Sequence, residues 1–88
     1  PNARTIKNIN IKKHLYSEAT EDAMKTYSLD TLDVFNLIKT GRVNFSESDT
    51  KSEGCKTYLI ENELKDRDVE LQIKNCDSTA IIELLVLR

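Results

Sequence analysis

Residues 57–87 read TYLIENELKDRDVELQIKNCDSTAIIELLVL, and the pattern of this stretch decides the fold. In its middle, Val69, Leu71 and Ile73 alternate with charged or polar neighbours, and a nearly continuous aliphatic run follows at residues 79–87. Side chains of a β-strand point alternately to the two faces of a sheet, so alternation of this kind is typical of strands. Short polar segments separate the runs and supply turns. We therefore predict a meander of antiparallel strands.

Two helical patterns precede the meander. Ser17 is a good N-cap residue, and apolar residues recur at spacings of three and four over residues 17–27. Asp30, followed three positions later by Asp33, resembles a capping box that begins a second helix at residues 31–40. Because the linker between the two patterns is so short, the helices must form a tight hairpin or corner.

The pattern changes from helical to alternating after Gly41, a residue suited to a left-handed helix end. The chain thus predicts one two-layer α+β domain, with two N-terminal helices followed by a three- to four-stranded antiparallel sheet. We divide residues 1–88 into a basic arm or short edge strand at 1–14, a helical hairpin at 17–40 and an antiparallel meander at 42–87.

The last strand is apolar on both faces, whereas a two-layer domain buries only one face of its sheet. By strict alternation, three of its residues face the helices, namely Ile82, Leu84 and Val86. The other alternate residues then form an interface on the opposite face, namely Ile81, Leu85 and Leu87.

Something should cover that second face, since large exposed apolar patches mark interaction sites. One candidate is the N-terminal segment that contains Ile6, Ile9 and Ile11. The other is a second copy of the chain, or a small protein partner. We favour a homodimer.

Composition places the chain among globular proteins without a membrane segment. Apolar residues make up 39% and charged residues 32% of it, and a disordered chain would lack the long apolar run near its end. That run, residues 80–87, is interrupted by Glu83 and is far shorter than the roughly 20 residues that cross a bilayer. The N-terminus shows no apolar core of a signal peptide. We expect a cytoplasmic protein.

The net charge of −2 hides an uneven distribution. Residues 1–42 carry seven Lys or Arg against five acids, and residues 43–88 carry six against ten. The first fourteen residues hold four basic side chains and no acid, and a basic arm of this kind can bind phosphates. The candidate nucleic-acid-binding residues are Arg4, Lys7, Lys12 and Lys13. A solvated terminus is the plainer interpretation, and nucleic acid is not the favoured partner.

Two cysteines, Cys55 and Cys76, are too few for a zinc site or a secreted disulfide scaffold. Free thiols in a reducing compartment are the expectation. A cross-strand disulfide is the alternative, and it requires the two strands to be neighbours with suitably placed Cβ atoms.

No pattern specific for catalysis stands out. The chain has only two glycines and no glycine-rich phosphate loop, no zinc-ligand spacing and no nucleophile elbow, so we expect no metal and no cofactor. Five acids surround one predicted hairpin, namely Glu61, Glu63, Asp66, Asp68 and Glu70. They either keep the sheet soluble or offer an acidic surface to a basic partner.

Residues 16–43, YSEATEDAMKTYSLDTLDVFNLIKTGRV, resemble the opening of small bacterial toxin-like domains allied to BrnT and RelE. Ser28, Leu29 and Asp30 match the turn between the helices of that group, and the Gly-Arg-Val at 41–43 matches the end of its second helix. The three-strand meander fits as well. The resemblance implies a RelE-like fold, and for RelE-like ribonucleases a scissile phosphate surrounded by Lys, Arg, His or Tyr, because charge gathers on its oxygens.

The resemblance does not extend to the polar positions of that group. Ala19, Ala23 and Tyr27 stand where it places a histidine and arginines. If the chain is a ribonuclease, the remaining candidates for catalytic residues are His14, Lys56, Tyr58 and Arg67, together with Lys74. A net-negative chain also gains little from counterion release on RNA.

Three functions therefore compete. The first is a non-enzymatic interaction module on a toxin-like scaffold, which binds a protein partner or itself. The second is a RelE-like ribonuclease toxin. The third is an acidic inhibitor or immunity protein that presents its acidic hairpin to a basic nuclease. The missing polar residues and the doubly apolar last strand favour the first.

Overall fold

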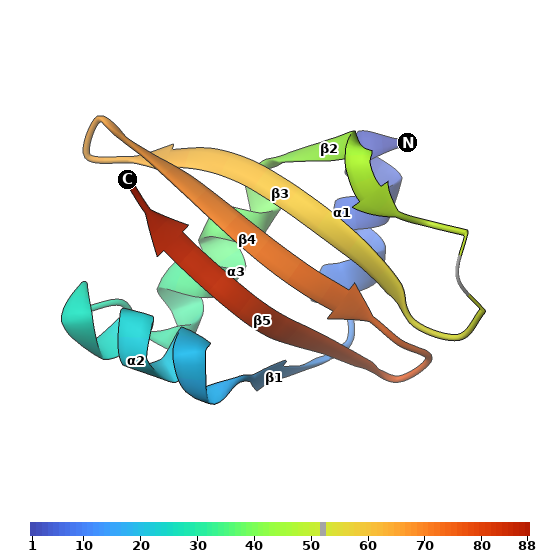
Figure 1. Ribbon diagram of the computed structural model, residues 1–88, viewed down its shortest axis with the longest axis horizontal. Coiled ribbons are helices and arrows are strands. Elements are labelled where there is room, and N and C mark those ends of the chain that lie inside the picture. Colours follow the sequence, from blue (N-terminus) through green and yellow to red (C-terminus); the bar gives the residue numbers. More distant parts are fainter. Residues whose placement is uncertain (52) are drawn as a thin grey trace.

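The computed structural model describes residues 1–51 and 53–88, and these form three helices and five strands (Figure 1). The strands make one sheet in the order β1-β5-β4-β3-β2, in which β1 runs parallel to β5 and the other neighbours are antiparallel. Helices α1 and α3 lie behind the sheet in Figure 1, and α2 packs beside β5. The elements are α1 (Asn2–Asn10), β1 (Lys13–Tyr16), α2 (Glu18–Thr26), α3 (Thr31–Lys39), β2 (Arg42–Asp49), β3 (Lys56–Leu64), β4 (Arg67–Asn75) and β5 (Thr79–Leu87).

The predicted fold class is wrong in its helix count and in its sheet. Two N-terminal helices and an antiparallel sheet of three or four strands were expected, whereas the described residues form three helices and a mixed five-stranded sheet. The extra helix and the parallel strand both come from residues 1–16, where the residues of β1 pair with the first half of β5.

The segment expected to be a basic arm or an edge strand forms α1. Ile6 and Ile9 are three residues apart, so one side of a helix carries both, and both are buried in the core. Ile11 is 72% exposed. The two-residue spacing of Ile9 and Ile11 imitates a strand and is the misleading signal. These isoleucines do not cover the second face of the sheet, because α1 lies on the same side as α3.

The two predicted helices are confirmed as α2 and α3, to within one residue at each end. Ser17 caps α2 by accepting a hydrogen bond from the backbone N–H of Thr20. Asp30 and Asp33 form the predicted capping box, with hydrogen bonds of 2.8 and 2.9 Å.

Gly41 does not have the predicted left-handed conformation. The C-cap that follows α3 is Thr40, whose φ is −98°, and Gly41 is not among the residues with positive φ. Gly41 lies where the chain passes close to β3, and a Cβ there would be 2.5 Å from Cγ2 of Ile60 and 2.9 Å from the carbonyl oxygen of Leu37. The glycine is therefore required by close packing, not by its backbone angles.

Strands β3 and β4 form a regular hairpin closed by a two-residue turn. Lys65 and Asp66 have φ of 51° and 65°, the signs of a type I′ turn, which matches the twist of paired strands. On the helix side, the hairpin and β5 bury Ile60, Leu71 and Ile82 completely. These side chains pack with α1 and α3 in one core.

A β-bulge interrupts β5 at Glu83. Ile82 lies opposite Ile73, but Leu84 lies opposite Gln72, so one extra residue separates the two pairs. The extra residue reverses the alternation beyond it, and Leu85 is buried at 5% exposure. The expectation that Leu85 faces outward is therefore wrong.

Side chains from the start of α2 hold the bulge in place. The backbone N–H of Ser17 donates to the Ile82 carbonyl at 3.1 Å, and its hydroxyl donates to the Glu83 carbonyl at 2.6 Å. The hydroxyl of Thr20, which is fully buried, donates to the Ile82 carbonyl at 2.6 Å. These bonds satisfy carbonyls that a longer β1 would otherwise have paired.

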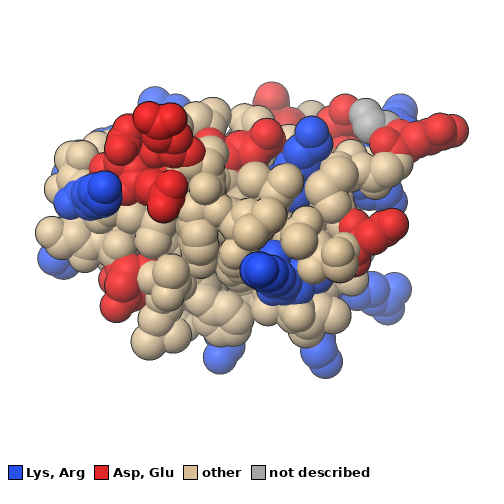
Figure 2. All heavy atoms as spheres, turned by 90° about the horizontal axis from the view of Figure 1, so that it is seen from below, with Lys and Arg blue, Asp and Glu red and all other residues tan. Residues whose placement is uncertain are grey.

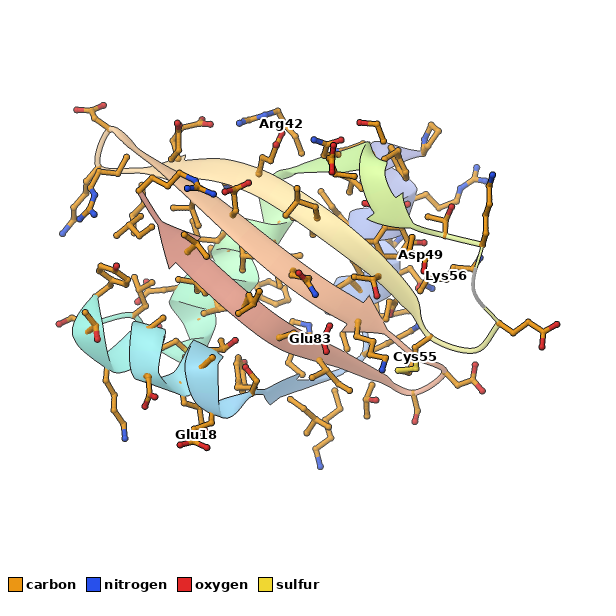
Figure 3. All side chains as sticks on the ribbon, viewed as in Figure 1. Glu18, Arg42, Asp49, Cys55, Lys56 and Glu83 are labelled. Carbon is orange, nitrogen blue, oxygen red and sulfur yellow. A yellow bond between two sulfur atoms is a disulfide. The ribbon has the colours of Figure 1, made fainter. Side chains whose placement is uncertain are left out.

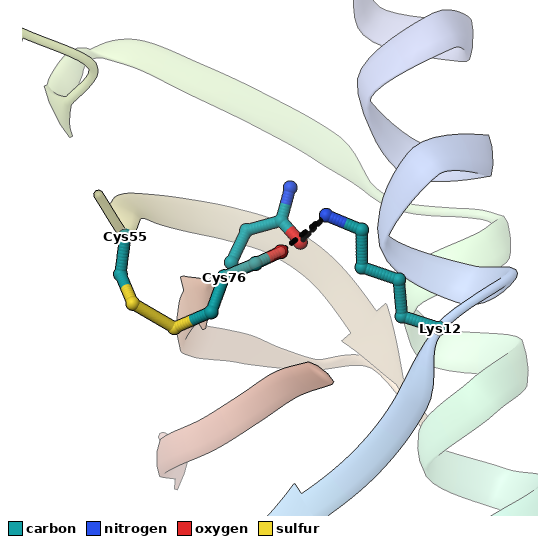
Figure 4. The surroundings of a disulfide bond; sticks show 4 residues. Lys12, Cys55 and Cys76 are labelled. Atoms are coloured by element: carbon teal, nitrogen blue, oxygen red, sulfur yellow. Dashed lines mark hydrogen bonds between the residues drawn. A yellow bond between two sulfur atoms is a disulfide. The ribbon is translucent and has the colours of Figure 1, made fainter. Parts of the chain in front are cut away.

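Cys55 and Cys76 form a disulfide, so the expectation of free thiols is wrong. Lys56 and Asn75 are the last pair of the β3–β4 ladder, and Cys55 precedes Lys56 whereas Cys76 follows Asn75. The two cysteines are therefore neighbours at the open end of the hairpin. The Nζ of Lys12 donates to Asn75 Oδ1 at 2.9 Å and to the Cys76 carbonyl at 2.5 Å (Figure 4). This end of the hairpin is thus tied to the segment between α1 and β1.

Candidate interaction surface

The helices cover only one face of the sheet. In Figure 1 the opposite face of β3, β4 and β5 is turned towards the reader, and no helix among the described residues lies over it. We call this side the open face. The register of the strands shows which side chains lie on the open face, because paired residues on neighbouring strands point to the same side of the sheet.

An apolar strip follows β1 and β5 on the open face. Leu84 is 44% and Val86 37% exposed, and both lie there because the bulge precedes them. Ile81 pairs with Leu15, which is 40% exposed, and extends the strip onto β1. Glu83 also lies on this face, where Gln72 donates to its carboxylate at 3.3 Å (Figure 3).

One end of the open face, beside the β3–β4 turn, is acidic. Glu61 lies directly opposite Glu70, and Glu63 lies opposite Asp68. Like charges in such cross-strand pairs repel each other. The six side chains that we call the acidic end are these four acids together with Arg42 and Arg88.

Two arginines offset part of the negative charge at the acidic end. Arg42 pairs with Glu63, and Arg88 pairs with Glu70. The hydrogen bond from Arg42 to Glu63, and the charge of that carboxylate, raise the pKa of Arg42 above its ordinary value. Both partners of the Arg42 pair are more than half exposed, so the pair itself adds little stability. Four acids and two arginines leave the acidic end with a formal charge of −2.

The other end of the open face is basic. Lys74 pairs with Ile81 and Lys13 pairs with Thr79, which places both lysines on the open face, Lys74 beside the end of the apolar strip and Lys13 just beyond it. Asp49 on the neighbouring β2 pairs with Thr57 at this end, whereas Lys56 pairs with Asn75 and by alternation points to the helix side. The two side chains that we call the basic end, Lys13 and Lys74, carry a formal charge of +2.

The predicted interface residues divide between the two faces. Ile81 lies on the open face, whereas Leu85 is in the core and Leu87 packs against it. Leu84 and Val86 were predicted to face the helices, and this is wrong, because the bulge turns both to the open face. The signal available was Glu83, since a charge within an aliphatic run marks where alternation fails.

The candidate ribonuclease residues do not converge on one point. Lys56 and Arg67 lie at opposite ends of the β3–β4 ladder, eight residues apart along each strand, which is roughly 26 Å. Tyr58 is 8% exposed and faces the core, edge to face with Phe45. His14 lies on the helix side, where its Nε2 donates to the Ile9 carbonyl at 3.2 Å.

Arg67 is engaged elsewhere: its guanidinium lies 5.7 Å from the ring centre of Tyr27, and its Nε donates to the Arg88 carbonyl at 2.8 Å. The predicted nucleic-acid-binding residues are also dispersed. Arg4 and Lys7 belong to α1 in the helix layer, Lys13 lies on the open face, and Lys12 bonds to the end of the hairpin.

Within residues 1–51 and 53–88, no group of three His, Cys, Asp or Glu side chains is placed to hold a metal ion. Among the same residues, no helix has both the length and the apolar character needed to cross a membrane. Comparison of the chain with protein-family models, curated proteins and solved structures finds no match. The resemblance to BrnT and RelE thus stays an untested prediction.

Proposed function

We propose that this domain is a non-enzymatic interaction module that associates with a second copy through its open face. The observation that carries the proposal is the apolar strip around Leu84 and Val86, which lies between an acidic and a basic end. Apolar side chains exposed on an open sheet supply the driving force for association, and charges at the rim select the partner and its orientation.

The charge pattern favours a symmetric dimer. A two-fold axis that lies in the plane between two facing open faces and runs across the strands places the acidic end of each copy over the basic end of the other. Formal charges of −2 and +2 then face each other twice, and the apolar strips meet between them. Such a contact uses the same patch on both copies and closes on itself, so it yields a dimer and no filament.

The open face is also large enough. Strands β3, β4 and β5 each have nine residues and the sheet has five strands among the described residues, so the sheet face measures roughly 30 by 20 Å at usual strand spacings. That area of roughly 600 Å² approaches the ~800 Å² per partner of a standard protein interface.

The first experiment is light scattering over a dilution series, with Leu84→Glu beside the unmodified chain. Leu32→Glu is the matched control, because Leu32 is 62% exposed but lies on α3, in the helix layer. We expect a dimer that dissociates on dilution, that Leu84→Glu splits and that Leu32→Glu leaves intact. If the unmodified chain stays monomeric at millimolar concentration, self-association is refuted.

A charge-swap experiment tests the orientation. Lys13→Glu with Lys74→Glu makes one variant, and Glu61→Lys with Asp68→Lys makes the other. Each variant alone opposes like charges in both contacts, so we expect each to be monomeric. Mixing them restores opposite charges in both contacts and should yield a mixed dimer. A mixture as monomeric as its components would contradict the proposed orientation.

The arrangement supports this module over the alternatives. A ribonuclease would need its basic groups around one phosphate, and Lys56 and Arg67 lie at opposite ends of the hairpin. The expected cytoplasmic location is not supported either, because structural disulfides such as Cys55–Cys76 persist mainly in oxidising compartments. We infer an oxidising environment for the native protein, to be checked by counting its free thiols by mass spectrometry under non-reducing conditions.

A further inference from the structure

A second surface lies in the helix layer, between α1 and α3. It is a groove of about 390 Å³ whose walls are mostly apolar. Ile6 lies deep in it, and Ile11, at 72% exposure, stands on its rim. The side chains that matter for its chemistry are Ala3, Ile6, Lys7, Ile11, Phe35 and Lys39.

The groove is held open by contacts between the two helices. The side-chain amide of Asn10 donates to the carbonyl of Phe35 at 3.3 Å, and the amide of Asn2 donates to the carbonyl of Gly41 at 3.5 Å. The start of α1 therefore lies at the end of α3, and the helices run antiparallel. A groove fixed in this way needs little rearrangement on binding, which favours affinity.

The charge at the groove is positive. Lys7 comes from α1 and Lys39 from α3, and neither has an ion pair among the described residues. Helix α1 contains no acidic residue, and the acid of α3, Asp33, belongs to its first turn, away from Lys39. The charged side chains that protrude from the lower edge of Figure 2, which is the helix side of the molecule, are basic.

We propose that this groove binds an acidic, amphipathic helix of a partner protein. The groove follows α1 from Ala3 to Ile11, about 12 Å at the rise of a helix, which matches two turns of a ligand helix with apolar residues at i, i+4 and i+7. Acidic residues beside that apolar stripe would face Lys7 and Lys39. The proposal is independent of the open face, which lies on the other side of the sheet.

Two other occupants fit less well. A nucleic acid needs a continuous basic track for its phosphates, whereas the two lysines border mostly apolar walls. A second copy would have to offer its own acidic helix, α2. The apolar side of α2 is already in use, because Ala23 and Met24 pack against the core of their own chain.

The test uses a fluorescein-labelled fourteen-residue peptide with leucines at i, i+4 and i+7 and glutamates on either side. Its binding to the full chain is measured by fluorescence anisotropy and mapped by amide chemical shifts. We expect saturable binding at micromolar concentration, with shifts confined to α1 and α3. The double variant Lys7→Glu with Lys39→Glu should weaken it at least tenfold and should bind a lysine version of the peptide instead.

Two controls keep the test decisive. Ile11→Ser, at an exposed position that should not affect folding, should also weaken binding, whereas Leu32→Glu on the same helix layer should not. A scrambled peptide of the same composition that binds equally well would overturn the proposal, because charge alone would then suffice. So would an oligouridylate that binds more tightly through the same lysines, or shifts that map to the open face.

Discussion

The β-bulge at Glu83 can be tested by comparing two adjacent leucines. Leu85 is 5% exposed and in the core, whereas Leu84 is 44% exposed on the open face. Truncation of a buried leucine to alanine typically costs about 3 kcal/mol, because both transfer free energy and cavity formation contribute. A leucine with nearly half of its surface in water loses less, about 1 kcal/mol. We therefore expect Leu85→Ala to lower the free energy of unfolding by roughly 2 kcal/mol more than Leu84→Ala.

Urea denaturation followed by circular dichroism measures both free energies. The measurement is made at two protein concentrations, since Leu84→Ala also weakens the proposed dimer and only that part of its effect depends on concentration. Strict alternation along β5 requires the opposite order, with Leu84 inside and Leu85 outside. A larger loss for Leu84→Ala at the lower concentration would therefore show that the bulge is absent and that the sheet register assigned here is wrong.

Three further predictions concern stability. Replacing Cys55 and Cys76 together by serine should lower the free energy of unfolding by about 3 kcal/mol, because the unfolded chain regains the entropy of an open loop of this length. Heat denaturation of the unmodified chain and the variant, with and without reductant, measures this loss. Thr20→Val should lower the free energy of unfolding by only about 1 kcal/mol in the same assay, because the Ile82 carbonyl keeps its hydrogen bond from the backbone N–H of Ser17. A loss above about 3 kcal/mol would mean that the bulge itself collapses. Burial raises the pKa of Tyr16, so the folded state holds this proton more tightly than the unfolded chain; the contribution of Tyr16 to stability should be constant below pH 10 and fall above it. Tyr16→Phe should reduce that fall in a pH series of urea denaturation curves, and an unchanged fall would exclude Tyr16 as its source.

The parts of the fold that local patterns determine could be predicted from the sequence. The capping residues Ser17 and Asp30 place the starts of α2 and α3, and the alternation of Val69, Leu71 and Ile73 places β4. These features depend on neighbours a few residues away, which a sequence displays directly.

The parts that depend on distant contacts could not be predicted. Helix α1 contains three asparagines and two buried isoleucines, so its formation depends on packing against α3 and the sheet rather than on helix propensity. The bulge in β5 depends on hydroxyls of Ser17 and Thr20, more than sixty residues away. Because the bulge decides which leucines lie on the open face, the candidate site was only partly predictable.

The two proposed surfaces make a joint prediction, because they lie on opposite layers of each copy. A dimer formed through the open faces has its two grooves on its outer sides, separated by about twice the 19 Å thickness of one copy. A flexible glycine-serine linker reaches a mean span of about 40 Å at roughly 50 residues. Two copies of the acidic peptide joined by such a linker should therefore bind the dimer 100-fold or more tightly than one copy, whereas a ten-residue linker should give no such gain. The gain should disappear with Leu84→Glu, which leaves each groove intact but separates the copies. If the long linker gives the same affinity as a single peptide while both surfaces function separately, the grooves do not face outward and the proposed dimer geometry is wrong.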